Sequence, residues 1–169
     1  MNEIKKLSFF IFAIFLFCYF FYLLDSNEIL EIKHDGLKSF VYFGIIIFSF
    51  FSILFSFFCY EEIKLKVLFS ILPIIAFLQI LSFGIINTFL SASSWKTQTL
   101  IYQNKFDSSK KVEFQMLDIG FAGYEKRTVE VNYITDWFFI SSPYTEEIFN
   151  SDSDWKKVNK EVNELELKD

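Results

Sequence analysis

The residues of this sequence whose side chains could most readily take part in catalysis or ligand binding are its single histidine and its single arginine. His34 stands between Lys33 and Asp35, and a histidine beside a carboxylate is a candidate for acid-base catalysis or metal binding. Either role needs partner residues, and the sequence has no HExxH or CxxC motif to supply them. We therefore interpret His34 as a solvated loop residue and expect no catalytic residue, no metal site and no cofactor.

Arg127 is a candidate for binding. Its planar guanidinium could clamp a carboxylate or a phosphate. Pairing with Asp118, Glu125 or Glu130 is the alternative, and we favour it because all three acids lie nearby in the sequence. The candidate contacts of this part of the chain with a partner are Tyr124, Arg127 and Trp155.

Two polar loops have simpler explanations than ligand binding. The loop from Ile119 to Glu125 contains Gly120 and Gly123, but it matches neither GxGxxG nor GK[ST] and lies between two strand-like segments. We interpret it as a hairpin turn in which glycine permits positive φ. The acidic run from Ser151 to Asp154 lacks the spacing of a calcium loop, so we interpret it as a helix cap.

The elements that position these residues fall into two regions of different composition. Of the 25 Phe residues, 19 precede Ser91. Three stretches of 18, 22 and 29 residues carry no charge: Leu7–Leu24, Ser39–Tyr60 and Val67–Trp95. A hydrocarbon core about 30 Å thick needs roughly 20 helical residues. The sequence therefore predicts a membrane domain over residues 1–90, with spans at about 7–24, 40–60 and 66–90, and an extramembrane domain over residues 91–169.

Polar residues inside the spans are candidates for helix packing or for contact with a partner. Three serines of the second span lie at i, i+3 and i+7 and share one helical face, and small residues let helices approach closely. A hydrophilic path through the membrane is the alternative. Pro73 predicts a kink in the third span. The candidate residues are Ser49, Ser52, Ser56, Gln79 and Asn87.

Beyond Trp95 the hydrophobic residues alternate with polar ones, which is typical of half-buried strands. We expect an antiparallel sheet in which the apolar residues of two neighbouring strands form one core face. The predicted strands are Trp95–Tyr102, Lys111–Asp118, Lys126–Ile134 and Trp137–Ser141, and the expected core face consists of Val112, Phe114, Met116, Val129, Val131 and Tyr133.

The C-terminal segment is expected to form a helix capped by Asp152 or Ser153. Its apolar residues are spaced as one helical stripe, which would pack on the sheet or, alternatively, lie on a membrane or a partner helix. The fold class is thus three transmembrane helices plus a small α+β extramembrane domain with a C-terminal helix. The stripe consists of Trp155, Val158, Val162 and Leu165.

The lysines beside the spans predict an orientation. Cytoplasmic segments attract Lys and Arg. Four lysines stand near the spans on each side, but those on the N-terminal side lie in shorter segments. We therefore expect a bacterial inner-membrane protein with a cytoplasmic N-terminus and a periplasmic C-terminal domain. The 10 positive and 14 negative residues from Ser91 onward argue against binding nucleic acid.

These observations favour a non-enzymatic membrane protein that acts by binding another protein. The plan of several spans with a small outer domain is similar to that of immunity proteins, which protect bacteria from membrane-attacking toxins; this resemblance concerns size and layout only. An accessory subunit of a transporter or secretion complex is the second hypothesis. A small channel or membrane enzyme is the third, and it would require polar residues clustered at one membrane depth.

Overall fold

The computed structural model describes residues 3–120, 123–145 and 154–167. The chain divides into two compact units. The helical unit comprises Met1–Leu23 and Gly36–Ala92, and the sheet unit comprises Leu24–Asp35 and Ser93–Asp169. The segment between the first two helices therefore belongs to the sheet unit.

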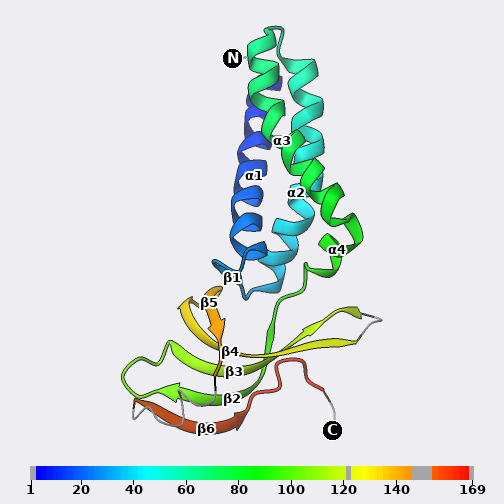
Figure 1. Ribbon diagram of the computed structural model, residues 1–169. Coiled ribbons are helices and arrows are strands. Elements are labelled where there is room, and N and C mark those ends of the chain that lie inside the picture. Colours follow the sequence, from blue (N-terminus) through cyan, green and yellow to red (C-terminus); the bar gives the residue numbers. More distant parts are fainter. Residues whose placement is uncertain (1–2, 121–122, 146–153, 168–169) are drawn as a thin grey trace. The chain divides into compact units, whose positions relative to one another are not determined.

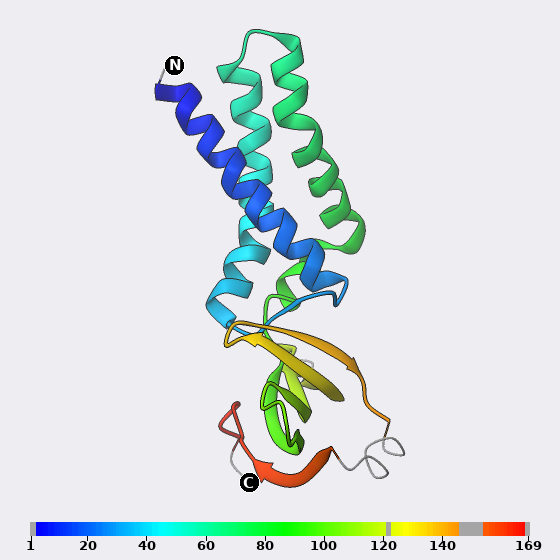
Figure 2. The same ribbon diagram turned by 90° about the vertical axis from the view of Figure 1, so that its left-hand side faces the viewer.

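Three helices in the described part of the chain are long and apolar enough to cross a membrane, as the sequence predicted. They are α1 (Glu3–Ser26), α2 (Asp35–Cys59) and α3 (Ile63–Phe83). Within the helical unit they lie side by side (Figures 1 and 2). Their lengths follow from uninterrupted runs of apolar residues that satisfy their backbone hydrogen bonds internally.

The third helix is shorter than the sequence predicted. It continues through the buried Pro73 and ends at Phe83, because Gly84 adopts a φ of 100° that interrupts the helical backbone. The short helix α4 (Ile85–Leu90) follows. Glycine tolerates this backbone angle because it has no Cβ, and this freedom places the break eleven residues after the proline.

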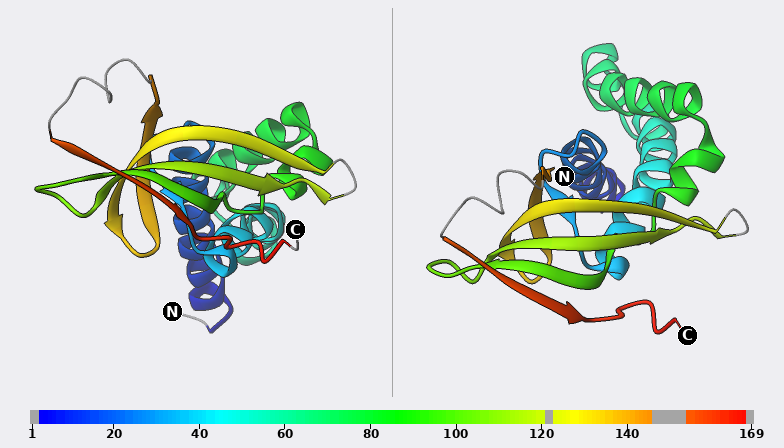
Figure 3. Two further views of the ribbon diagram at one scale, coloured as in Figure 1. Left: turned by 90° about the horizontal axis from the view of Figure 1, so that it is seen from below. Right: turned by 60° about the horizontal axis from the view of Figure 1, so that its bottom comes forward.

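The sheet unit forms one antiparallel sheet in the order β1-β5-β4-β3-β2-β6. Its strands twist strongly, with β6 along the outer side of β2 (Figure 3). Four of its strands confirm the predicted ones. The bounds are β1 Glu31–Ile32, β2 Lys96–Asn104, β3 Lys110–Asp118, β4 Tyr124–Thr135, β5 Phe138–Pro143 and β6 Trp155–Glu161.

The loop between β3 and β4 is the predicted hairpin turn. Gly120 and Gly123 have φ values of 67° and 93°, and the Gly123 amide donates a hydrogen bond of 3.1 Å to the Gly120 carbonyl. These positive angles explain why the turn contains two glycines.

The expectation of a single core face in β3 and β4 was wrong. In the register, Val112 lies opposite Glu130, and Val129 lies opposite Glu113. Directly paired residues share a face, so the apolar residues of β3 and those of β4 lie on opposite faces. One small cluster forms around Tyr102 and Val112, and another around Val129, Val131 and Phe139. The second face consequently also carries Glu113, Gln115 and Arg127.

The expectation of a C-terminal helix was also wrong, because Trp155–Glu161 is strand β6. It pairs antiparallel with β2, where Leu100 faces Lys160 and Gln103 faces Lys156. Pairing satisfies the backbone groups at the edge of β2, which a helix in this segment would leave unpaired, and the strand's lysines are typical of an exposed edge. The expected caps, Asp152 and Ser153, lie outside the described residues.

Candidate functional site

A buried carboxylate stands at the centre of the polar face of the sheet. Glu113 of β3 is 3% exposed. Its Oε2 accepts hydrogen bonds from Thr97 Oγ1 at 2.7 Å, from Gln115 Nε2 at 3.0 Å and from the Tyr133 hydroxyl at 3.0 Å. These neutral donors replace the water that a buried carboxylate loses, so Glu113 is held in one position.

An ion pair borders this carboxylate on the side of β2. Lys33 Nζ lies 2.6 Å from Glu164 Oε2 and 3.0 Å from Thr97 Oγ1, and it donates a third hydrogen bond to the Trp95 carbonyl at 3.3 Å. The Thr97 amide also donates to Glu164 Oε2, at 2.7 Å. Three segments far apart in the sequence are thereby joined: the connection after α1, the start of β2 and the C-terminal tail.

A second ion pair is buried more deeply at the other end of the polar face. Arg127 NH2 lies 2.6 Å from Glu31 Oε2, and the side chains are 16% and 4% exposed. The guanidinium also donates to Gln115 Oε1 from Nε at 3.0 Å and lies 4.1 Å from the centre of the Trp95 ring. Ser141 donates to the other Glu31 oxygen. Gln115 therefore links this pair to the Glu113 cluster.

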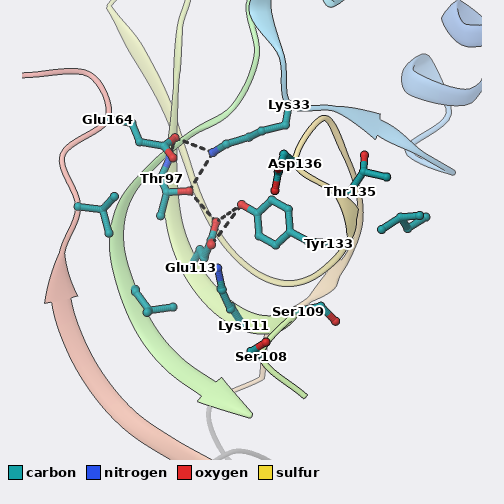
Figure 4. Close-up of a pocket in the computed structure, with 13 residues that line it drawn as sticks. Lys33, Thr97, Ser108, Ser109, Lys111, Glu113, Tyr133, Thr135, Asp136 and Glu164 are labelled. Carbon is teal, nitrogen blue, oxygen red and sulfur yellow. Dashed lines mark hydrogen bonds and ion pairs between the residues drawn. The ribbon is translucent and has the colours of Figure 1, made fainter. Parts of the chain in front are cut away.

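The polar face opens into a pocket of about 520 Å³ (Figure 4). Burial and the adjacent charge of Glu113 raise the pKa of Tyr133 well above its usual range, so its hydroxyl remains a donor at neutral pH. The Lys111 Nζ lies 4.9 Å from the centre of the Tyr133 ring. The remaining lining residues supply hydroxyls, carboxylates and apolar surface. They are Lys33, Thr97, Leu100, Ser108, Ser109, Ile134, Thr135, Asp136, Val162 and Glu164.

The three candidate contacts predicted in the C-terminal region do not form one site. Arg127 does pair with a carboxylate, but the prediction of its partner was wrong, because the acid is Glu31 rather than a residue close in sequence. Tyr124 is exposed at the start of β4. Trp155 packs against the cluster of Tyr102 and Val112, whereas Arg127 lies on the opposite face of the sheet.

The candidate residues of the spans lie within the helical unit. Ser49, Ser52 and Ser56 are at most 2% exposed, so the helical unit itself covers their shared face. Ser49 and Ser56 donate to backbone carbonyls of α2 at 3.0 and 2.7 Å. Gln79 of α3 accepts a hydrogen bond of 2.9 Å from the Tyr19 hydroxyl of α1. A hydrogen-bond partner for Gln79 on another helix is therefore present in this chain.

The last two polar candidates do not line the pocket. Asn87 is exposed on α4 and donates to the Phe83 carbonyl at 2.9 Å. His34 is exposed, and its ring centre lies 5.1 Å from that of Trp137. In the described residues, no group of three His, Cys, Asp or Glu side chains is arranged to hold a metal ion.

Sequence reasoning missed most of the polar network. Period-two alternation identifies the polar side of a strand, but it does not show whether that side is covered. The available signal was the alternation of Lys111, Glu113 and Gln115 with apolar residues, together with a charged connection between two spans. The missed residues are Glu31, Lys33, Thr97, Lys111, Glu113, Gln115, Tyr133, Asp136 and Glu164.

Comparison with models of protein families, with curated proteins and with solved structures yields no match. The chemistry of the pocket and the surface of the helices are therefore the grounds for assigning a function.

Proposed function

We propose that this chain is a membrane-anchored binding protein whose sheet unit receives a polypeptide partner in the polar pocket. The first support is the surface of the helices. On α2 the buried residues include Ser49, Ser52 and Ser56, whereas Phe50, Phe57 and other large apolar side chains are exposed. A helix in water would place these residues the other way round. Hydrocarbon accommodates this arrangement, because small residues between helices permit close packing.

The second support is that the pocket is already assembled. Lys33, Glu113 and Glu164 are each fixed by hydrogen bonds or an ion pair within the sheet unit. A site whose polar groups are held before binding loses less conformational entropy when a ligand enters. Its charges of both signs, its hydroxyls and the apolar Leu100, Ile134 and Val162 match the mixed surface of a polypeptide.

The sheet unit is a better candidate for partner contact than the spans. The serine face expected to dock on another helix is covered within the helical unit, and Gln79 bonds to Tyr19. The pocket, by contrast, opens at exposed residues such as Ser108 and Asp136. This contrast favours recognition through the sheet over the role of an accessory subunit that docks by its helices.

We further propose that the protein resides in a bacterial inner membrane, that its sheet unit is periplasmic, and that its partner is a membrane-attacking toxin neutralised as by an immunity protein. Alkaline washing of membranes tests insertion, because an integral protein stays with the lipid. A C-terminal alkaline phosphatase fusion should be active and a C-terminal green fluorescent protein fusion dark. The reverse pattern would overturn the orientation but not the insertion.

Site-specific photocrosslinking in native membranes tests the pocket. A photoreactive phenylalanine at Ser108 lies in the pocket lining, whereas one at the exposed Glu125 on β4 lies outside it. We expect one polypeptide adduct from position 108, absent from position 125 and weakened by K111E. Equal adducts from both positions, or an adduct unaffected by K111E, would refute recognition through this pocket.

A further inference from the structure

Two large apolar side chains of the sheet unit are exposed close to the ends of the candidate spanning helices. Trp137, in the turn between β4 and β5, is 53% exposed, and Ile29, three residues after the end of α1, is 58% exposed. Exposing such groups to water is unfavourable. Indole combines an apolar ring with one N–H donor, and tryptophan is enriched where a bilayer meets water.

Contacts within the sheet unit hold Trp137 beside the start of α2. Its carbonyl accepts a hydrogen bond of 2.8 Å from the Lys33 amide, and its ring centre lies 5.1 Å from that of His34. His34 is followed directly by Asp35, the first residue of α2. The Asp35 carboxylate accepts hydrogen bonds from Ser94 and Lys96. The residue at which α2 begins is therefore itself fixed to the sheet unit.

These contacts limit how far Trp137 can lie from the boundary of the hydrocarbon. The His34 ring centre lies about 3.4 Å from its own Cα, and consecutive Cα atoms are about 3.8 Å apart, so the centre of the Trp137 ring lies within about 12 Å of the Asp35 Cα, where α2 begins. The uncharged part of α2 begins at Ser39, one helical turn later. A bilayer has roughly 5–8 Å of polar headgroup region on each side of its hydrocarbon core. The headgroup region is therefore within reach of the indole.

We infer that Trp137 and Ile29 insert into the headgroup region of the leaflet where α1 ends and α2 begins, and that they anchor the turn between β4 and β5 to lipid. This inference rests on the proposed membrane insertion and adds a lipid contact to the sheet unit. The same turn supplies Thr135 and Asp136 to the pocket. Lipid contact at Trp137 consequently holds the pocket rim near the bilayer surface, where a membrane-attacking polypeptide arrives.

Fluorescence quenching in liposomes tests this contact. The variant W95F/W155F leaves Trp137 as the single tryptophan, and W95F/W137F leaves Trp155 of β6 as a matched control. Each is reconstituted into liposomes whose lipids carry bromine near the headgroup end of the acyl chain. We expect bromolipid to reduce Trp137 emission by about half and to leave Trp155 emission nearly unchanged. Iodide in the water should show the opposite order.

Two outcomes would overturn the inference. Equal quenching of both tryptophans by iodide would place Trp137 in water, and quenching of Trp137 by neither agent would place it inside protein. If a double variant fails to fold, the native chain is compared with W137F instead. The difference between their emissions under each quencher gives the contribution of Trp137. Alkaline extraction of the same liposomes separates the two proposals: a chain that resists extraction while Trp137 remains unquenched by lipid is inserted but lacks this anchor.

Discussion

Replacing Arg127 by methionine should strongly destabilise the sheet unit. The substitution leaves the Glu31 carboxylate, whose side chain is 4% exposed, without its cation, although Ser141 still donates to it. Removing one partner of a buried ion pair costs about 3–5 kcal/mol. The variant also loses the hydrogen bonds to Gln115 and the contact with Trp95, so we expect the upper part of this range.

This energy converts into a readily measured change in Tm. In domains of this size, 1 kcal/mol shifts Tm by about 4–8 °C, so R127M should lower the Tm by at least about 12 °C. Tryptophan fluorescence of the detergent-solubilised chain is a suitable probe, because Trp95, Trp137 and Trp155 all belong to the sheet unit. R127K keeps the charge but loses the planar fork, and it should give a smaller decrease.

A double substitution separates the ion pair from general damage to the fold. In E31Q/R127M neither residue is charged, so no unpaired carboxylate is buried, and we expect a Tm well above that of R127M. K126M, which changes an exposed neighbouring residue, should shift stability by no more than about 0.5 kcal/mol. The reasoning fails if R127M resembles K126M, or if E31Q/R127M is destabilised by the sum of its single substitutions.

Three further predictions concern other elements. A Cβ at Gly44 would lie 2.6 Å from Cys18 Sγ, so G44A should destabilise the helical unit by about 1–3 kcal/mol in chemical unfolding. Adding C18A to G44A should restore much of this stability. If the losses of the two single variants simply add in the double variant, the contact is contradicted. The pKa of Tyr133 is raised above its usual value of about 10, so the contribution of its protonated hydroxyl to stability is complete below that pH and declines above it. Between about pH 9 and about pH 11 the Tm of the native chain should therefore fall more steeply than the Tm of Y133F. Parallel Tm curves for the two chains would refute this prediction. Gln103 and Lys156 are paired across β2 and β6, so Q103C/K156C should form a disulfide on oxidation in a background without Cys18 and Cys59. The disulfide is detected as a change in gel mobility that reducing agent reverses. A C-terminal helix would not permit this disulfide.

The parts of the fold that the sequence could predict are those decided locally. Long uncharged runs identify α1, α2 and most of α3, and alternation over a few residues identifies β2 to β5. Strand β6 depends on the free edge of β2, more than fifty residues earlier, so its local pattern was read as a helix. The break at Gly84 was missed because Pro73 was the stronger local signal, although a single glycine with positive φ ends α3.

The buried charges were missed for a different physical reason. Glu31 and Lys33 lie in the connection between α1 and α2, where charges are ordinarily solvated. Their partners Arg127 and Glu164 come from β4 and the C-terminal tail. No periodicity relates positions about a hundred residues apart. Only the pairing of β1 with β5 brings Glu31 to the face that carries Arg127.

The position of these charges suggests what the network contributes. A buried ion pair adds little net stability compared with apolar residues of the same volume, but an incorrect pairing leaves a charge unsatisfied. The pairs of Glu31 with Arg127 and of Lys33 with Glu164 therefore favour one register of the segment from Leu24 to Asp35 on the sheet over its neighbours. That segment carries Lys33 into the pocket and ends where α2 begins. The network thus stabilises the one arrangement in which the connection between the helices also completes the proposed binding site.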